Sequence, residues 1–155
     1  MKKITIALLC IIMAAAAKAQ ITDTSALSKN AAYAGVTPAK KHYKAIYQLD
    51  TNDPKIIDKA LHNMQSALND PRLAGKLELE LVTFFSGTDV VLKGSRYEQD
   101  LKDLIKKGVI VAQCNNSLLQ RKIGRDKVYD FVAVVPSGNG ELIIRASEGW
   151  VIVKP

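Results

Sequence analysis

The stretch Val109-Ile110-Val111-Ala112-Gln113-Cys114-Asn115-Asn116-Ser117 joins a short apolar run to a polar cluster that is typical of the start of a helix. It predicts a strand over residues 109–113, followed by a helix over residues 117–122 that ends at Gly124. Cys114 lies between the two, at the carboxyl end of the strand and the amino end of the helix. Free N–H groups and the helix dipole favour negative charge there, so we expect the Cys114 thiolate to be stabilised.

The same alternation of strand and helix signals extends in both directions from Cys114. Further strands are predicted over residues 43–49, 77–85, 131–135 and 150–153, and further helices from Asp53-Pro54, from the capping box Ser95-Arg96-Tyr97-Glu98 and over residues 141–147. The run over residues 131–135 has no polar alternation, which predicts a strand buried on both faces. This order of elements predicts an α/β fold, a three-layer α/β/α domain with a five-stranded parallel sheet.

The first residues have the pattern of a secretory signal peptide. A basic start, Met1-Lys2-Lys3, precedes an apolar stretch that contains Cys10, and Ala17-Lys18-Ala19 matches a small-x-small cleavage site. We therefore expect cleavage after Ala19, which removes residues 1–19. The mature protein is expected to be periplasmic or secreted, with no membrane insertion after cleavage.

Two parts are expected in the mature chain. Residues 20–40 are rich in Ala, Ser and Thr and predict an amino-terminal arm, whereas residues 41–155 are long enough for one α/β domain. The chain has 22 Lys and Arg and 15 Asp and Glu, and loss of three lysines with the signal peptide leaves 19 basic residues and a net charge of +4. This charge is spread along the chain without a dense basic block, which argues against nucleic-acid binding.

Cys114 is the main candidate for chemistry in the mature chain. No Cys-x-x-Cys motif is present, so a dithiol mechanism within one chain is excluded. The neighbouring Asn115, Asn116 and Ser117 are expected to cap the helix and to line a polar pocket. Arg121 and Lys122 follow one to two turns along the helix; they are either supports for a thiolate or solvated surface charges. The competing interpretation is that Cys114 is a small buried side chain with a packing role.

Three aspartates, Asp50, Asp53 and Asp89, follow the first two strands and are expected near the same edge of the sheet. Asp53 is explained as a helix cap, and no partner base for paired-carboxylate catalysis is evident. Two histidines, His42 and His62, and one cysteine do not predict a metal site.

The Gly138-Asn139-Gly140 turn has two interpretations. It is placed to bind an anion before a helix, but a tight strand–helix turn explains it equally well. It lacks the third glycine of the dinucleotide-binding fingerprint. We therefore expect no cofactor.

Several segments resemble the DsrE/DsrF-like family. The segments are Gly108 to Leu119, Phe85 to Leu92, Gly138 to Ile143 and Glu148 to Pro155, within roughly residues 43–155. The resemblance implies a five-stranded parallel sheet between helices and assembly into trimers or hexamers. It also implies that Cys114 matches the cysteine on which family members carry sulfur as a persulfide. Gly87, Gly138 and Asn139 lie in the matching segments and are predicted binding residues, together with Asn115, Asn116 and Ser117.

Two classes of function follow. In the first, the protein is an exported sulfur carrier or sulfurtransferase-like protein that receives sulfur on Cys114 from a donor and passes it to an acceptor protein. In the second, it is a non-enzymatic oligomeric module for binding or assembly, and Cys114 is structural. In both, a homo-oligomer is expected, and the apolar stretch Val90-Val91-Leu92 is the predicted contact.

Overall fold

The computed structural model describes residues 25–155, and the chain divides into two units between Thr37 and Pro38. The expected signal peptide, with Cys10 and its cleavage site after Ala19, lies outside the described residues and stays a prediction. Within the predicted arm, residues 25–31 are helical. No helix among residues 25–155 is both long and apolar enough to cross a membrane.

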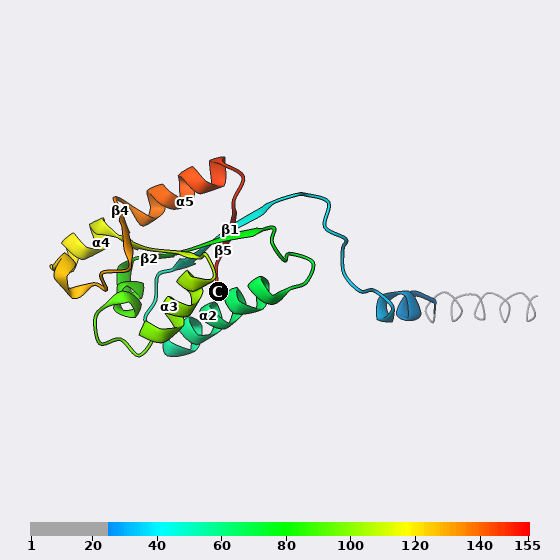
Figure 1. Cartoon of the computed structure of the whole chain (residues 1–155), viewed down its shortest axis with the longest axis horizontal. Coiled ribbons are helices and arrows are strands. Elements are labelled where there is room, and N and C mark those ends of the chain that lie inside the picture. The colour runs from blue at the N-terminus through cyan, green and yellow to red at the C-terminus, as the bar shows by residue number, and fades with distance from the viewer. Residues whose placement is uncertain (1–24) are drawn as a thin grey trace, which may run out of the picture. The chain divides into compact units, whose positions relative to one another are not determined.

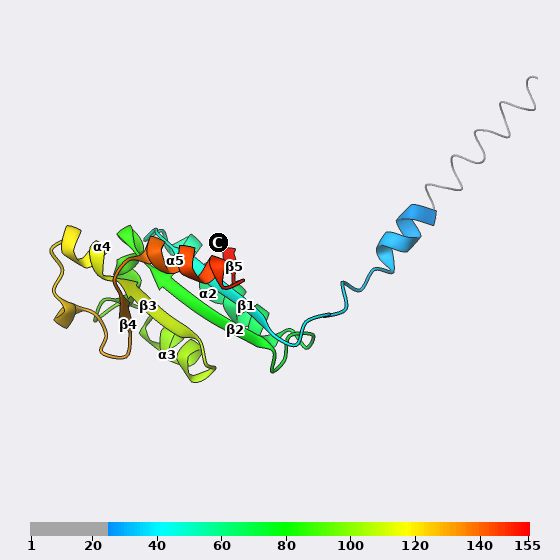
Figure 2. The same ribbon diagram turned by 90° about the horizontal axis from the view of Figure 1, so that it is seen from above.

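Five parallel strands form one sheet in the order β4-β3-β2-β1-β5. The strands are β1 (Tyr43–Leu49), β2 (Leu77–Thr83), β3 (Ile110–Cys114), β4 (Ala133–Val135) and β5 (Val151–Val153). The helices are α2 (Pro54–Asn69), α3 (Glu98–Lys106), α4 (Asn115–Gln120) and α5 (Gly138–Ser147), with two 3-10 helices, η1 (Phe85–Val91) and η2 (Arg125–Lys127). Helices α2 and α3 cover one face and α5 the other (Figures 1 and 2). This confirms the predicted five-stranded parallel sheet.

Helix α2 begins where the sequence predicts it. The Asp53 carboxylate accepts a hydrogen bond from the N–H of Lys55 at 2.9 Å, and Pro54 occupies the first turn, where its missing N–H costs nothing. The stripe Ile57, Ala60, Leu61 and Met64 is buried against the sheet. These contacts hold α2 against the sheet directly after the short loop that follows β1 and contains Asp50.

The two faces of the sheet are buried to different extents. The face under α2 and α3 carries the larger core, to which β1 contributes Tyr47 and Leu49. The face under α5 has a small core of four buried residues, Ile46, Val82, Leu142 and Trp150. Helix α5 therefore covers its face more thinly, and its Ile143 and Ile144 side chains are exposed.

Two predictions about buried strands and contacts are wrong. Strand β4 is the edge of the sheet, so Ala133 and Val134 are exposed instead of buried on both faces. The apolar run Val90-Val91-Leu92 belongs to η1 and the residue after it, and Val90 and Val91 are at most 1% exposed. The run packs into the main core and is not available as a contact between subunits.

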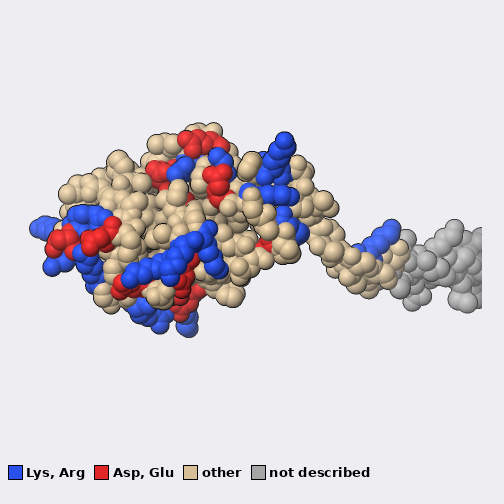
Figure 3. Space-filling view, viewed as in Figure 1, with Lys and Arg blue, Asp and Glu red and all other residues tan. Residues whose placement is uncertain are grey.

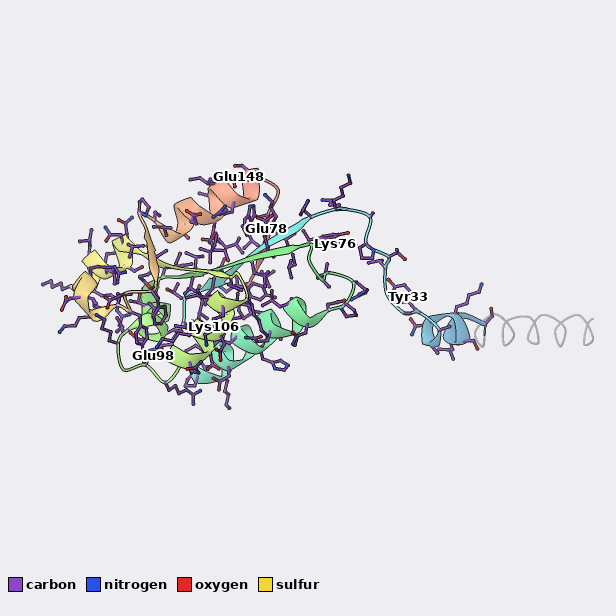
Figure 4. All side chains as sticks on the ribbon, in the orientation of Figure 1. Tyr33, Lys76, Glu78, Glu98, Lys106 and Glu148 are labelled. Atoms are coloured by element: carbon purple, nitrogen blue, oxygen red, sulfur yellow. The ribbon has the colours of Figure 1, made fainter. Side chains whose placement is uncertain are left out.

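Several predicted boundaries also shift. Strand β2 ends at Thr83, two residues early, because the chain turns into η1 at Phe85. The predicted capping box does not form: the Ser95 hydroxyl accepts the N–H of Tyr97, and Glu98 binds Lys102 at 2.6 Å. Helix α3 therefore begins at Glu98, and Figure 4 labels Glu98 and Lys106 at its two ends. The Glu98 carboxylate pairs with Lys102 one turn along the helix instead of accepting the backbone N–H that a capping box requires.

A buried carboxylate lies under α5. Glu80 is 1% exposed, and its carboxylate lies 2.8 Å from the Arg145 guanidinium, which also contacts Glu141 at 2.9 Å. The Glu80–Arg145 contact is an ion pair without good hydrogen-bond geometry. The guanidinium also lies over the Trp150 ring, 4.4 Å from its centroid. Burial raises the pKa of Glu80, although Arg145 opposes this rise.

We predict that Arg145→Met lowers the free energy of unfolding at neutral pH by about 3 kcal/mol, because it leaves a buried carboxylate without its cation. Glu80→Gln should restore most of this loss in the double variant, since the amide carries no charge. Chemical denaturation of the four proteins measures the coupling. Equal losses from Arg145→Met with either residue at position 80 would contradict this account.

The same pair sets a pH dependence. Because the pKa of Glu80 is raised on folding, there is a pH range, between the unfolded and the folded pKa, in which the folded state holds a proton that the unfolded chain has lost. Its contribution to stability is therefore complete at pH below the unfolded pKa and is lost as pH rises through the folded pKa. Glu80→Gln should flatten this part of the stability profile.

Candidate functional site

Cys114 ends β3 and forms the N-cap of α4. Its pairing with Val135 of β4 brings it beside the loop that leads into α5. The N–H of Asn116 donates to the Pro136 carbonyl at 3.3 Å and so joins the start of α4 to that loop. Two helices therefore begin next to one sulfur atom.

The electrostatics of the sulfur reflect two opposing effects. Burial raises the pKa of the Cys114 thiol, whose residue is 5% exposed. The Ser117 hydroxyl and the N–H groups of Gly138, Ser117 and Asn116, at the starts of α5 and α4, lower it. These polar groups outweigh burial, so the pKa of the thiol lies below its ordinary value. The site therefore favours the thiolate, which is the nucleophilic form.

A cavity of about 440 Å³ opens at the opposite end of the sheet, and one of about 320 Å³ lies beside the sulfur. The cavity beside Cys114 is mostly polar and neutral in its lining, with two aromatic side chains and a single carboxylate. Its other lining residues are Asp50, Phe84, Phe85, Asn116, Ser117, Gln120, Ser137 and Asn139. A space of this size admits a small sulfur compound or the end of a side chain from a partner.

The predicted site residues fall into three groups. Asn116, Ser117 and Asn139 line the cavity with Cys114, and Gly138 contributes its N–H to the sulfur. Asn115 is exposed in the first turn of α4, outside the lining. The last, Gly87, has a packing role outside the cavity, because a Cβ there would collide with the Leu49 carbonyl.

The helix boundaries at the site differ from those predicted. Helix α4 begins at Asn115, two residues earlier than expected, so Asn115 and Asn116 lie within its first turn and Cys114 itself takes the cap position. Gly138-Asn139-Gly140 likewise forms the first turn of α5 instead of a loop before it, because the Ser137 hydroxyl caps the helix by accepting the N–H of Gly140 at 3.1 Å. With these bounds, Asn116, Ser117 and Gly138, whose N–H groups lower the pKa of the Cys114 thiol, all lie in the first turn of a helix.

The charged candidates have separate roles. Asp50 lines the cavity and pairs with Lys154 at 3.2 Å, while Asp89 pairs with Arg121 at 2.6 Å. His62 is exposed on α2, and His42 lines the cavity at the far end of the sheet. Within residues 25–155, no three His, Cys, Asp or Glu side chains are grouped so as to hold a metal ion.

A buried polar network below Cys114 was missed in the sequence. Gln113 is fully buried. Its side-chain carbonyl oxygen accepts a hydrogen bond from the Thr83 hydroxyl at 2.6 Å. Its side-chain amide donates to the Thr88 hydroxyl at 3.0 Å and to the backbone carbonyl of Cys114 at 2.8 Å. It joins β2, β3 and η1 at the edge where the cavity opens. The available signal was a glutamine inside an apolar strand, which implies partners in the core.

Comparison with known proteins agrees with this geometry. A family model described as the DsrE/DsrF-like family matches residues 42–155. The chain belongs to the DsrE/DsrF-like family. This family is generally linked to sulfur relay, and Cys114 with its cavity lies inside the matched range.

Solved structures share the fold. The protein of unknown function MTH1491 from Methanobacterium thermoautotrophicum has 26% sequence identity and a TM-score of 0.69, over 73% of this chain and 99% of that one. The ychN protein from E. coli has 16% identity and a TM-score of 0.59, over 74% of this chain and 99% of that one. The protein BT1422 from Bacteroides thetaiotaomicron has 11% identity and a TM-score of 0.58, over 72% and 94%. No curated protein matches the chain.

We predict that Gly138→Ala raises the pKa of the Cys114 thiol. A Cβ at Gly138 would lie 2.9 Å from the Phe84 ring, so the start of α5 must shift and weaken the N–H contact to the sulfur. The pKa can be followed by the ultraviolet absorbance of the thiolate. Gly140→Ala, whose new Cβ would be less crowded, at 3.3 Å from Ser137, is the matched control; an equal shift in both variants would contradict the prediction.

Proposed function

We propose that this protein is a sulfur carrier that holds a persulfide on Cys114. The observation that supports this most strongly is the position of Cys114, which caps α4 beside the start of α5 and opens onto a cavity that Ser117 also lines. Polar groups of Ser117 and Gly138 lower the pKa of its thiol there. A cysteine with a purely packing role has no need of such donors, which stabilise charge on the sulfur. Family membership supports the same proposal.

The chemistry needs one thiolate and one sulfane donor. The Cys114 thiolate attacks the outer sulfur of a donor persulfide, a sulfur–sulfur bond forms at Cys114, and the donor leaves as its own thiolate. The product is a Cys114 persulfide. In the second half, an acceptor thiolate attacks the outer sulfur and Cys114 leaves as a thiolate again, so the protein undergoes no net oxidation or reduction. The N–H groups that stabilise Cys114 also make it a good leaving group.

The lining of the cavity suits this role. Amide side chains of Asn116, Gln120 and Asn139 surround the space in which the outer sulfur would lie and are able to donate hydrogen bonds to it. Asp50 is the one carboxylate in the lining, and Lys154 partly neutralises it. The absence of a cation from these lining residues favours a singly charged or neutral donor over a doubly charged one.

We predict that reduced protein treated with polysulfide gains the mass of one sulfur atom, whereas Cys114→Ser gains none. Intact-protein mass spectrometry measures the change. The serine variant should keep its fold, because the replacement is nearly isosteric. Ser117→Ala keeps the thiol and serves as the control for local disturbance; it should load sulfur more slowly, since it loses one hydrogen bond to the sulfur.

The alternative function has its own outcome in this experiment. If the native protein resists both alkylation and sulfur loading while the unfolded chain reacts readily, Cys114 is structural. The protein would then be a binding or assembly module without a sulfur-carrier role.

We further propose a homo-oligomer, a trimer or hexamer, in which the α5 face makes the contact. The support is the exposure of two adjacent isoleucines on α5, Ile143 at 70% and Ile144 at 55%, above the smaller of the two cores.

Figure 3 shows acidic and basic side chains interspersed over the face that it presents, which does not resemble a continuous nucleic-acid-binding surface.

We predict that light scattering gives a trimeric or hexameric mass at micromolar concentration and that Ile143→Lys with Ile144→Lys reduces it. Charged side chains would then have to be buried in the contact. Leu119→Lys, at an equally exposed apolar residue on α4, is the matched control. A monomeric wild type would overturn the proposal of an oligomer, and dissociation by Leu119→Lys alone would place the contact elsewhere.

A further inference from the structure

Two residues in the described part of the chain, Phe85 and Lys122, have a positive φ without being glycine. Their φ angles are 52° and 55°, in the left-handed region that side chains with a Cβ rarely adopt. Such strain persists where the surrounding contacts hold it, and it gathers at functional sites. These two residues are distant in sequence, but both adjoin one side chain, that of Arg121.

The turn at Lys122 ends α4 and fixes the position of Arg121. The N–H of Lys122 donates to the Leu119 carbonyl at 3.1 Å, and the N–H of Ile123 donates to the Leu118 carbonyl at 2.9 Å. These bonds close the last turn of the helix in the way that a left-handed residue allows. Arg121 therefore leaves the helix at a defined place, next to η1.

The Arg121 guanidinium holds the start of η1 in two ways. One nitrogen donates to the Asp89 carboxylate at 2.6 Å, and the other donates to the Phe85 carbonyl at 3.1 Å. The side-chain amide of Asn52 donates to the second Asp89 oxygen at 3.0 Å. Phe85 is 68% exposed, so backbone contacts, and not burial of its side chain, hold this residue in its strained conformation.

The strained backbone at Phe85 reaches the site through Ser117. The N–H of Phe85 donates to the Ser117 hydroxyl oxygen at 2.8 Å. Because the oxygen accepts this bond, the hydroxyl proton is left to face the cavity that Ser117 lines together with Cys114, and the hydroxyl lowers the pKa of the Cys114 thiol. Ser117 is 6% exposed, so water does not compete freely for this proton. A relaxed conformation at Phe85 would turn its N–H away from Ser117.

We propose that Arg121 is a positioning residue for Cys114: together with Asp89 it holds the Phe85 backbone in the conformation that directs the Ser117 hydroxyl toward the sulfur. Arg121 acts through hydrogen-bond geometry and does not touch the sulfur. The value of this arrangement to the protein rests on the proposed sulfur-carrier function, but the geometry itself does not. Part-exposed ion pairs contribute little to stability, so the fold itself should not depend on Arg121.

The test is Asp89→Asn, because positioning and simple charge predict opposite results. Removing a negative charge near the site would by itself favour the thiolate and lower the pKa of Cys114. If Asp89 acts by anchoring Arg121, the variant loses the Ser117 hydrogen bond and the pKa rises instead. At a pH below the thiol pKa, we expect alkylation of Cys114 to slow roughly fivefold, the effect of losing about one hydrogen bond. Asp126→Asn removes an equivalent surface charge outside this network and should leave the pKa unchanged.

A double variant separates positioning from general loosening. Ser117→Ala should raise the pKa by itself, and adding Asp89→Asn should then change it no further, because both act through one hydroxyl. A pKa that falls or stays constant in Asp89→Asn, or that rises equally with alanine at position 117, would overturn the proposal. Thermal melts of each variant show that the pKa is read on folded protein.

Sulfur loading of the same variants keeps the two proposals distinguishable. If wild-type protein takes up no sulfur while Asp89→Asn raises the thiol pKa, the sulfur-carrier function fails and the positioning role of Arg121 stands. If sulfur loads normally and Asp89→Asn leaves both pKa and loading rate unchanged, the positioning role fails and the sulfur-carrier function stands.

Discussion

Parallel pairing of β2, β3 and β4 is the constraint on which the rest of this structure depends. Because parallel strands end at one edge, the chain must leave the sheet there three times, through η1, α4 and α5. Gln113 links two of these exits inside the core: it joins β3 to Thr83 at the end of β2 and to Thr88 in η1. The cysteine at the end of β3 therefore lies beside the starts of the helices that follow β2, β3 and β4.

The state of the thiol follows from a balance of burial and hydrogen bonding. Burial alone would raise the pKa of Cys114 and leave an inert side chain, but the donors at Ser117 and Gly138 outweigh it. These groups need fixed positions, since a mobile donor would bind water instead. Two features of the structure fix them: Gly138 packs closely against Phe84, and Phe85 adopts a strained backbone conformation.

The two sides of the sheet have different physical roles. Under α2 and α3 the core is large and almost wholly apolar, and it supplies the stability of the domain. Under α5 the core is small and contains the buried Glu80 with its arginine partner. A buried ion pair of this kind is costly to desolvate and adds little net stability, but loss of one partner leaves a buried charge. Substitutions on this side of the sheet that break the pair should therefore lower the free energy of unfolding most.

The sequence by itself determined the order of strands and helices and the position of Cys114. These depend on local pattern: apolar runs, Asp53 before Pro54, and the glycines that end helices. It also indicated an edge of the sheet rich in polar residues, since strand ends can be read from the pattern. It predicted Asn116 and Ser117 beside the cysteine and Asn139 as a further binding residue, and the structure places all three in the lining of one cavity with Cys114.

Only the tertiary structure decided which strands lie at the edges and which residues meet across the site. The apolar run that contains β4 predicted a buried strand, yet β4 is an edge, because edge position depends on strand order and not on composition. The run at Val90 was likewise misjudged, because η1 folds it into the core. The link from Asp89 through Arg121 and Phe85 to Ser117 joins residues more than 30 positions apart, and such contacts exist only once the strands have paired.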